Sequence, residues 1–208
     1  DSSGSGKHSS YFTLVTSLFG LMKAHPQVFV SGCIQALNFG IFLAVWLGLA
    51  LHLTSPEMGY GVDVVGYLAG FAVIAMYATP KLGAWADRVG PAKARFKTSM
   101  IQLAGIALLW PFGGNLWLLI IPIVIMNTVG PAIDVAGRMT TLSLAPAIRT
   151  RLMTGYIMLM FLGAGFASWA GTAAYEVAGW AGNAALALAM SVGLVLLSYL
   201  QLRATRQT

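Results

Sequence analysis

The chain has 208 residues, of which 58% are hydrophobic and only 9% are charged, and its formal net charge is +6. Soluble domains have about 25% charged residues, so this composition excludes an ordinary water-soluble fold, and the long apolar runs exclude a disordered chain. The single cysteine, Cys33, excludes an intrachain disulfide framework and a cysteine-based zinc site. An all-α integral membrane protein is the class that remains.

Residues 1–23 come before the first apolar segment and are predicted to form a cytoplasmic linker. The first ten residues are rich in Ser and Gly and lack an initiator Met, so we expect the chain to be cut from a longer one. Residues 11–22 are apolar but too short to cross a bilayer, which predicts an interfacial helix. A secretory signal is the alternative, but Lys7 is its only basic residue and no small-residue cleavage site follows.

Six transmembrane helices are predicted in a domain over residues 24–202. A helix needs about 20 apolar residues to span the hydrocarbon, and we expect helices in the apolar stretches that charged residues bound. The stretch from 98 to 133 is too long for one span, and its Pro111 and Gly113-Gly114-Asn115 sequence predicts a break. The predicted helices are residues 28–53, 64–82, 96–110, 116–136, 152–174 and 181–199.

The basic residues predict the orientation of these helices. All twelve Lys and Arg residues fall before the first helix, at the junction of the second and third (including the adjoining helix ends), between the fourth and fifth, or in the tail at 203–208. The opposite loops hold Glu57, Asp63 and Glu176 and no basic residue. Because Lys and Arg favour the cytoplasmic side, both termini are predicted to be cytoplasmic. This segregation explains the positive net charge, so no nucleic-acid partner is expected.

The loop between the second and third predicted helices carries the strongest motif. It contains Gly83, Asp87, Arg88, Gly90 and Lys93, in the pattern G-x-x-x-D-R-x-G-x-x-K. Gly83 permits close helix approach, Asp87 ends a helix, Gly90 permits a tight turn, and the basic residues favour cytoplasmic headgroups. Any short cytoplasmic loop is basic and Gly-rich, so the spacing and the position between the helices are what make the motif specific.

This loop resembles the signature of the major facilitator superfamily, a family of twelve-helix secondary transporters. Arg138, the segment 144–151 and the Gly-rich helix from Tyr156 resemble the region joining the tenth and eleventh helices of its bacterial efflux permeases. The resemblance covers nearly the whole chain and implies the C-terminal half, with inverted repeats of three helices each. It also implies an N-terminal six-helix half as partner, in the same chain or as a second copy, and a multi-pass protein of the bacterial inner membrane.

In that family the solute lies between the halves, and the resemblance implies that the first and fourth helices of a half line the cavity. The first helix carries Gln35, Asn38, Phe42 and Trp46 on one side. The two amides are candidates to contact a small-molecule solute, the alternative being a hydrogen bond between helices. The two aromatic residues are weaker candidates, because aromatic residues at helical spacing more often serve packing.

The fourth helix carries Asn127, Pro131, Asp134 and Arg138 on one face. Asn127 is expected near mid-depth and is a further cavity candidate. Tyr156 on the fifth helix is another, with packing or interfacial anchoring as the alternative.

Asp134 and Arg138 are spaced by four residues, which makes an ion pair geometrically easy. A structural pair at the membrane surface is one interpretation. The resemblance implies a second, in which this pair joins Asp87 and Arg88 in a cytoplasmic gate.

The coupling ion is less well indicated. Solute efflux with proton-coupled antiport is expected from the resemblance, yet no apolar stretch contains a carboxylate at mid-membrane depth. The titrating acid is therefore expected in the N-terminal half, unless Asp134 reaches further into the cavity. His52 is a second candidate to carry the proton, because histidine exchanges protons near neutral pH. A lone interfacial His is more often an anchor or a helix cap.

Enzymatic function is not expected. The spans contain no Ser–His or paired-Asp site, the histidines are not clustered with acids, and there is no phosphate-binding GxxxxGK[ST]. We therefore expect no catalytic residue, no metal site and no cofactor. The alternatives to half of a transporter are a self-dimerising six-helix half-transporter or channel, and an inactive membrane module.

Overall fold

The computed structural model describes residues 11–71, 73–144 and 146–207, and the part of the chain so described is helical, without strands. The elements are α1 (Tyr11–Ala24), α2 (Pro26–Leu53), α3 (Val62–Gly70), α4 (Val73–Val89), α5 (Pro91–Ala107), α6 (Leu109–Phe112), α7 (Leu116–Leu142) and α8 (Pro146–Gln207). The Ser- and Gly-rich start at 1–10 lies outside the described residues.

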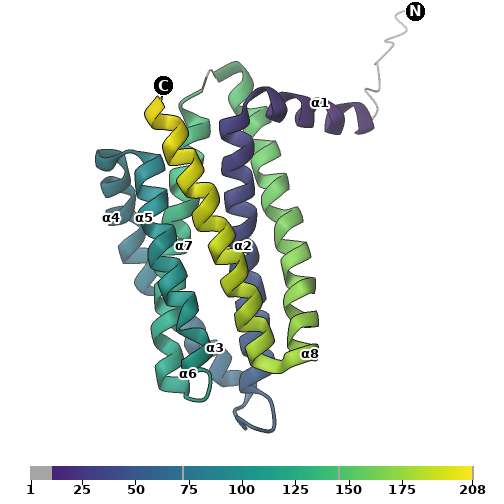
Figure 1. The fold of residues 1–208 in the computed structure, drawn as a ribbon, viewed down its shortest axis with the longest axis vertical. Coiled ribbons are helices and arrows are strands. Elements are labelled where there is room, and N and C mark those ends of the chain that lie inside the picture. The colour runs from purple at the N-terminus through teal and green to yellow at the C-terminus, as the bar shows by residue number, and fades with distance from the viewer. Residues whose placement is uncertain (1–10, 72, 145, 208) are drawn as a thin grey trace, which may run out of the picture.

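Three of the described helices are long and apolar enough to cross a membrane, namely α2, α7 and α8. Each of the others has 17 residues or fewer. The longest, α8, reverses direction at Ala178 and Gly179, whose φ/ψ of −138/19 and 59/−149 are not helical. Figure 1 shows its two limbs, light green and yellow, running in opposite directions. The chain therefore has the long apolar helices of a membrane protein.

The helix boundaries agree with the sequence in some places and differ in others. The predicted helices 28–53 and 116–136 lie within α2 and α7, and 152–174 and 181–199 lie in the two limbs of α8. The predicted helix 64–82 is divided, because α3 ends at Gly70 and α4 begins at Val73. Glycine is among the weakest helix formers, and Gly66 and Gly70 have no neighbour within 4 Å of an added Cβ to support them. The predicted helix 96–110 is likewise interrupted at Leu108, between α5 and α6.

The two ends of the bundle differ in charge. Figure 1 shows α1, the α4–α5 and α7–α8 junctions and the end of α8 at one end, and the α2–α3 junction, α6 and the reversal of α8 at the other. The first end carries basic residues at these junctions, including Arg88, Lys93, Arg149 and Arg203, whereas the second carries Glu57, Asp63 and Glu176. The charge segregation found along the sequence is thus a segregation in space.

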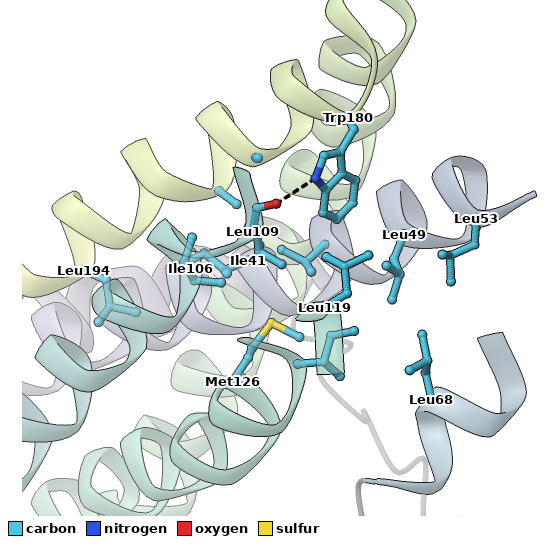
Figure 2. Close-up of a cluster of buried hydrophobic side chains, with 14 of the residues drawn as sticks. Ile41, Leu49, Leu53, Leu68, Ile106, Leu109, Leu119, Met126, Trp180 and Leu194 are labelled. Carbon is cyan, nitrogen blue, oxygen red and sulfur yellow. Dashed lines mark hydrogen bonds between the residues drawn. The ribbon is translucent and has the colours of Figure 1, made fainter. Parts of the chain in front are cut away.

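The main hydrophobic core is built from α2, α3, α5, α6, α7 and α8 (Figure 2). At its acidic end, Trp180 Nε1 donates a 2.8 Å hydrogen bond to the carbonyl of Leu109. His52 stacks on Trp180, with ring centroids 4.7 Å apart, and its Nε2 lies 2.8 Å from the carbonyl oxygen of Gly113. His52 is therefore a buried contact that joins the end of α2 to the α6–α7 turn.

Small residues let α2 and α8 approach closely. A Cβ added at Gly163 would lie 2.5 Å from Ala36 Cβ, and one at Gly171 would lie 2.8 Å from Ala44 Cβ. In a bilayer, the lipid tails are as apolar as the helix surfaces, so the hydrophobic effect does not drive helices together. Close backbone packing supplies the association energy instead. This packing sets the position of α2, which forms one wall of the cavity described next.

Candidate functional site

A cavity of about 270 Å³ lies between α2 and α7. Both helices contribute polar side chains from their middle turns to a wall that is otherwise apolar. The lining residues are Gln35, Asn38, Phe39, Phe42, Met126, Asn127, Gly130, Pro131 and Asp134. The cavity therefore includes Gln35, Asn38, Phe42 and Asn127 of the solute-contacting candidates, and Asp134 of the gate candidates.

The amides of Gln35 and Asn38 form a small network that joins the helices. Asn38 Nδ2 donates to Gln35 Oε1 at 3.1 Å and to the carbonyl of Gly130 at 3.0 Å, so it links α2 to α7. Gln35 Nε2 donates a weaker bond to Met160 Sδ on α8 at 3.5 Å. Both residues are buried. The interhelical hydrogen bond and the cavity position, considered as alternatives from the sequence, are here combined in the same side chains.

Asn127 makes no such link. Its Nδ2 donates to the carbonyl of Ile123, one turn earlier in α7, at 2.8 Å. One turn later stands Pro131, which has no N–H to donate to the carbonyl of Asn127. The cavity wall on α7 therefore has a backbone carbonyl without its usual helical donor.

Aromatic side chains border the apolar part of the cavity. The rings of Phe39 and Phe42 are stacked with centroids 5.9 Å apart and an angle of 13° between planes. Trp46 lies beyond Phe42 at 6.2 Å and is not among the lining residues. Trp46 packs against the hydrophobic core, which agrees with the packing interpretation of this position.

Asp134 has two side-chain partners. Its Oδ2 accepts a 2.9 Å hydrogen bond from Arg138 Nε in an ion pair, and its Oδ1 accepts one from the hydroxyl of Tyr156 at 2.9 Å. The guanidinium of Arg138 also lies over the Tyr156 ring, 5.7 Å from its centroid. Tyr156 is fully buried and does not line the cavity. Its role is to hold the carboxylate that does.

The gating motif shows a different arrangement from the expected cluster. Asp87 and Arg88 are exposed at the end of α4, and neither forms an ion pair within the described chain. Among the described residues, no ion pair joins either of them to Asp134 or Arg138, so the gate cluster stays a prediction. Gly90 has φ of 90°, which glycine adopts without strain and which turns α4 into α5. No atom of the described residues lies within 4 Å of a Cβ added at Gly83, so the close helix contact expected there is not seen. Lys93 is exposed on α5.

Arg95 is a buried residue that the sequence reasoning counted only as a loop charge. It is 1% exposed and connects α5 with three other helices. Its Nη1 donates to Ser31 Oγ at 2.9 Å and to Gln201 Oε1 at 2.8 Å, and its Nε donates to the carbonyl of Ile133 at 3.3 Å. The sequence contained a signal for this burial, because the spacing of Arg95, Thr98 and Gln102 places them on one face of a helix. The structure buries all three.

Within the described residues, no group of three His, Cys, Asp or Glu side chains is placed to hold a metal ion. What the site offers is a solute-sized cavity with amide groups, stacked aromatic rings and one carboxylate at its border.

Comparison with known proteins gives an informative similarity. The chain is 29% identical over 159 residues to a probable transporter of Streptomyces coelicolor. The similar region makes up 76% of this chain but 36% of that protein, so the chain spans about a third of the length of its relative. No protein-family model matches the chain. The similarity and the long apolar helices together support a membrane protein related to transport.

Proposed function

We propose that this chain is the C-terminal half of a secondary transporter of the major facilitator superfamily, which moves a small amphipathic solute across the bacterial inner membrane. The observation that carries the proposal is the cavity between α2 and α7, because polar amides in the middle of long apolar helices are expensive unless they serve a partner or a solute. The similarity to a probable transporter and the G-x-x-x-D-R-x-G motif support it.

The proposed topology has six crossings with the basic end of the bundle in the cytoplasm. In this arrangement α3 and α4 together form one crossing, α5 and α6 form another, and each limb of α8 crosses once. The charge difference between the two ends supports this orientation. An N-terminal half of similar size would complete the solute pathway from the other side of the cavity.

The proposed mechanism is efflux by alternating access, coupled to protons. Asp134 is the acid that lines the cavity in the described chain, so it is the candidate for the coupling group on this half. Binding a proton would weaken its ion pair with Arg138 and its ability to hold Tyr156 in place. Loss of the contacts of Asp134 with Arg138 and Tyr156 is the step that would free the basic end of α7 from α8.

Transport is tested with the full-length protein reconstituted into proteoliposomes, with an imposed pH gradient and rhodamine 6G or ethidium as fluorescent solutes. We expect gradient-dependent accumulation that Asp134→Asn reduces at least tenfold. Glu176→Gln is the matched control, because Glu176 is an exposed carboxylate at the opposite end. Gradient-independent leakage of both dyes would favour a channel, and no movement at all would favour an inactive module.

A further inference from the structure

We infer that the cavity between α2 and α7 selects solutes with a nitrogen head group that carries N–H donors, attached to an apolar body. The inference rests on the proposed function and adds the chemical class of the solute. It follows from the atoms that the cavity presents, which are mainly hydrogen-bond acceptors.

The orientations of two amides are set by backbone carbonyls. A carbonyl oxygen only accepts, so the Asn38 nitrogen must face Gly130 and the Asn127 nitrogen must face Ile123. Asn38 Nδ2 uses both of its hydrogens, because it also donates to Gln35 Oε1. Within the described part of the chain, the side-chain oxygens of Asn38 and Asn127 accept no hydrogen bond. These two oxygens are therefore left as acceptors.

Two further groups add to the acceptors near Gly130. Pro131 leaves the backbone carbonyl of Asn127 without its helical donor, and both residues line the cavity. Gln102 on α5 is 1% exposed, and neither its Oε1 nor its Nε2 has a partner among the described residues. A Cβ added at Gly130 would lie 3.6 Å from Asn38 Oδ1 and 3.9 Å from Gln102 Oε1, so these oxygens converge on the same glycine. Gln102 is not among the residues that line the cavity, so the side-chain acceptors that a solute meets beside Gly130 are the oxygens of Asn38 and Asn127.

The rest of the cavity suits an apolar body. Phe39 and Phe42 present stacked rings, and Met126 contributes a flexible thioether side chain. The carboxylate of Asp134 also borders the cavity, but Arg138 already balances its charge at 2.9 Å. N–H donation, more than positive charge, is therefore the property that the cavity recognises.

The test compares ligands that share a body and differ in the head group. The full-length protein in lipid nanodiscs is titrated by calorimetry with 4-phenylbutylammonium, its N,N,N-trimethyl analogue and 4-phenylbutyrate. The first two have the same charge, but only the primary ammonium has N–H donors. We expect the primary ammonium to bind about tenfold more tightly than the trimethyl analogue, because hydrogen bonds to charged groups contribute at this level. The carboxylate, which only accepts, should bind most weakly.

Asn127→Leu provides the mutational test. Its side chain bonds only to its own helix, so the variant removes an acceptor without breaking a contact between helices. We expect the preference for the primary ammonium to fall to threefold or less, whereas Ile121→Leu on the exposed face of α7 should retain it. Equal or tighter binding of the trimethyl analogue, tightest binding of the carboxylate, or no binding of any of the three would overturn the inference. The dye-transport measurement judges the proposed function separately, because neither dye is used in this titration.

Discussion

The hydroxyl of Tyr156 donates a 2.9 Å hydrogen bond to Oδ1 of Asp134, so a fully buried side chain on α8 fixes a carboxylate of α7 at the border of the cavity. The other carboxylate oxygen is held by Arg138. One acid is thus held by a neutral donor and a cationic donor from different directions. This arrangement ties the start of α8 to the basic end of α7.

Tyr156→Phe removes only the hydroxyl and tests this tie. We expect the transport rate to fall several-fold, because Asp134 is then held by Arg138 alone. The free energy of unfolding should fall by about 1–2 kcal/mol, the range for a hydrogen bond to a charged acceptor. Dye transport in proteoliposomes and thermal unfolding in detergent measure the two effects. Tyr60→Phe is the control, because Tyr60 is exposed in the α2–α3 loop and its variant should match the native protein.

Gln201→Leu tests the buried arginine. It removes the acceptor that lies 2.8 Å from Arg95 Nη1 and leaves a guanidinium in an apolar environment with one fewer partner. We expect a loss of about 2–3 kcal/mol in the free energy of unfolding, because an unsatisfied buried charged donor is costly. Thermal unfolding in detergent measures it. Gln27→Leu is the matched control: its exposed side chain lies at the same end, and only its backbone carbonyl contacts Gln201. Equal stability of the two variants would contradict the importance of this network.

The long helices could be predicted from the sequence because hydropathy and length determine them directly. The helices expected at 28–53 and 116–136 lie in α2 and α7, and the reversal of α8 at Ala178 and Gly179 lies between the helices expected at 152–174 and 181–199. The division of the helix expected at 64–82 was missed because the residues on both sides of the break, from 64 to 78, form one continuous apolar run. Hydropathy does not report how poorly Gly66 and Gly70 support a helix without neighbours.

The cavity was partly predictable because Gln35, Asn38 and Asn127 are amides in apolar helices, which a single sequence reveals. The roles of Tyr156 and Arg95 were not, since they depend on which helices pack together. Arg95 lies among five basic residues of one junction, and counting charges cannot separate a buried arginine from an exposed one. Its shared face with Thr98 and Gln102 was the available signal.

The close contact of α2 and α8 is tested by a pair of glycines two residues apart. Even a single Cβ added at Gly163 would lie 2.5 Å from Ala36 Cβ and 3.1 Å from Ala36 Cα. Gly163→Val adds a branched side chain at this point, so the helices must separate. We expect a loss of about 1–3 kcal/mol, the usual cost of overpacking. Gly165→Val is the control on the exposed face of the same limb, where no atom lies within 4 Å. Thermal unfolding of both variants in detergent should show destabilisation of the first alone.

The two glycines of the α4–α5 motif give opposite expectations for the same substitution. Gly90 has φ of 90° and ψ of 140°, a region that residues with a Cβ rarely adopt, so Gly90→Ala should lower the free energy of unfolding by about 1–3 kcal/mol. Gly83 lies within the helix α4 with open space around its Cα, so Gly83→Ala should raise it by up to about 1 kcal/mol through helix propensity. Thermal unfolding of the purified variants measures both signs.

The same pair separates packing from function in this motif. If Gly83→Ala were destabilising, a neighbouring helix would have to approach α4 at that point, contrary to the open space seen here. If it is stabilising but impairs dye transport, Gly83 is needed in a second conformation in which a helix moves against α4. The alternating access proposed above requires such a conformation, and we therefore expect Gly83→Ala to raise the melting temperature while lowering the transport rate.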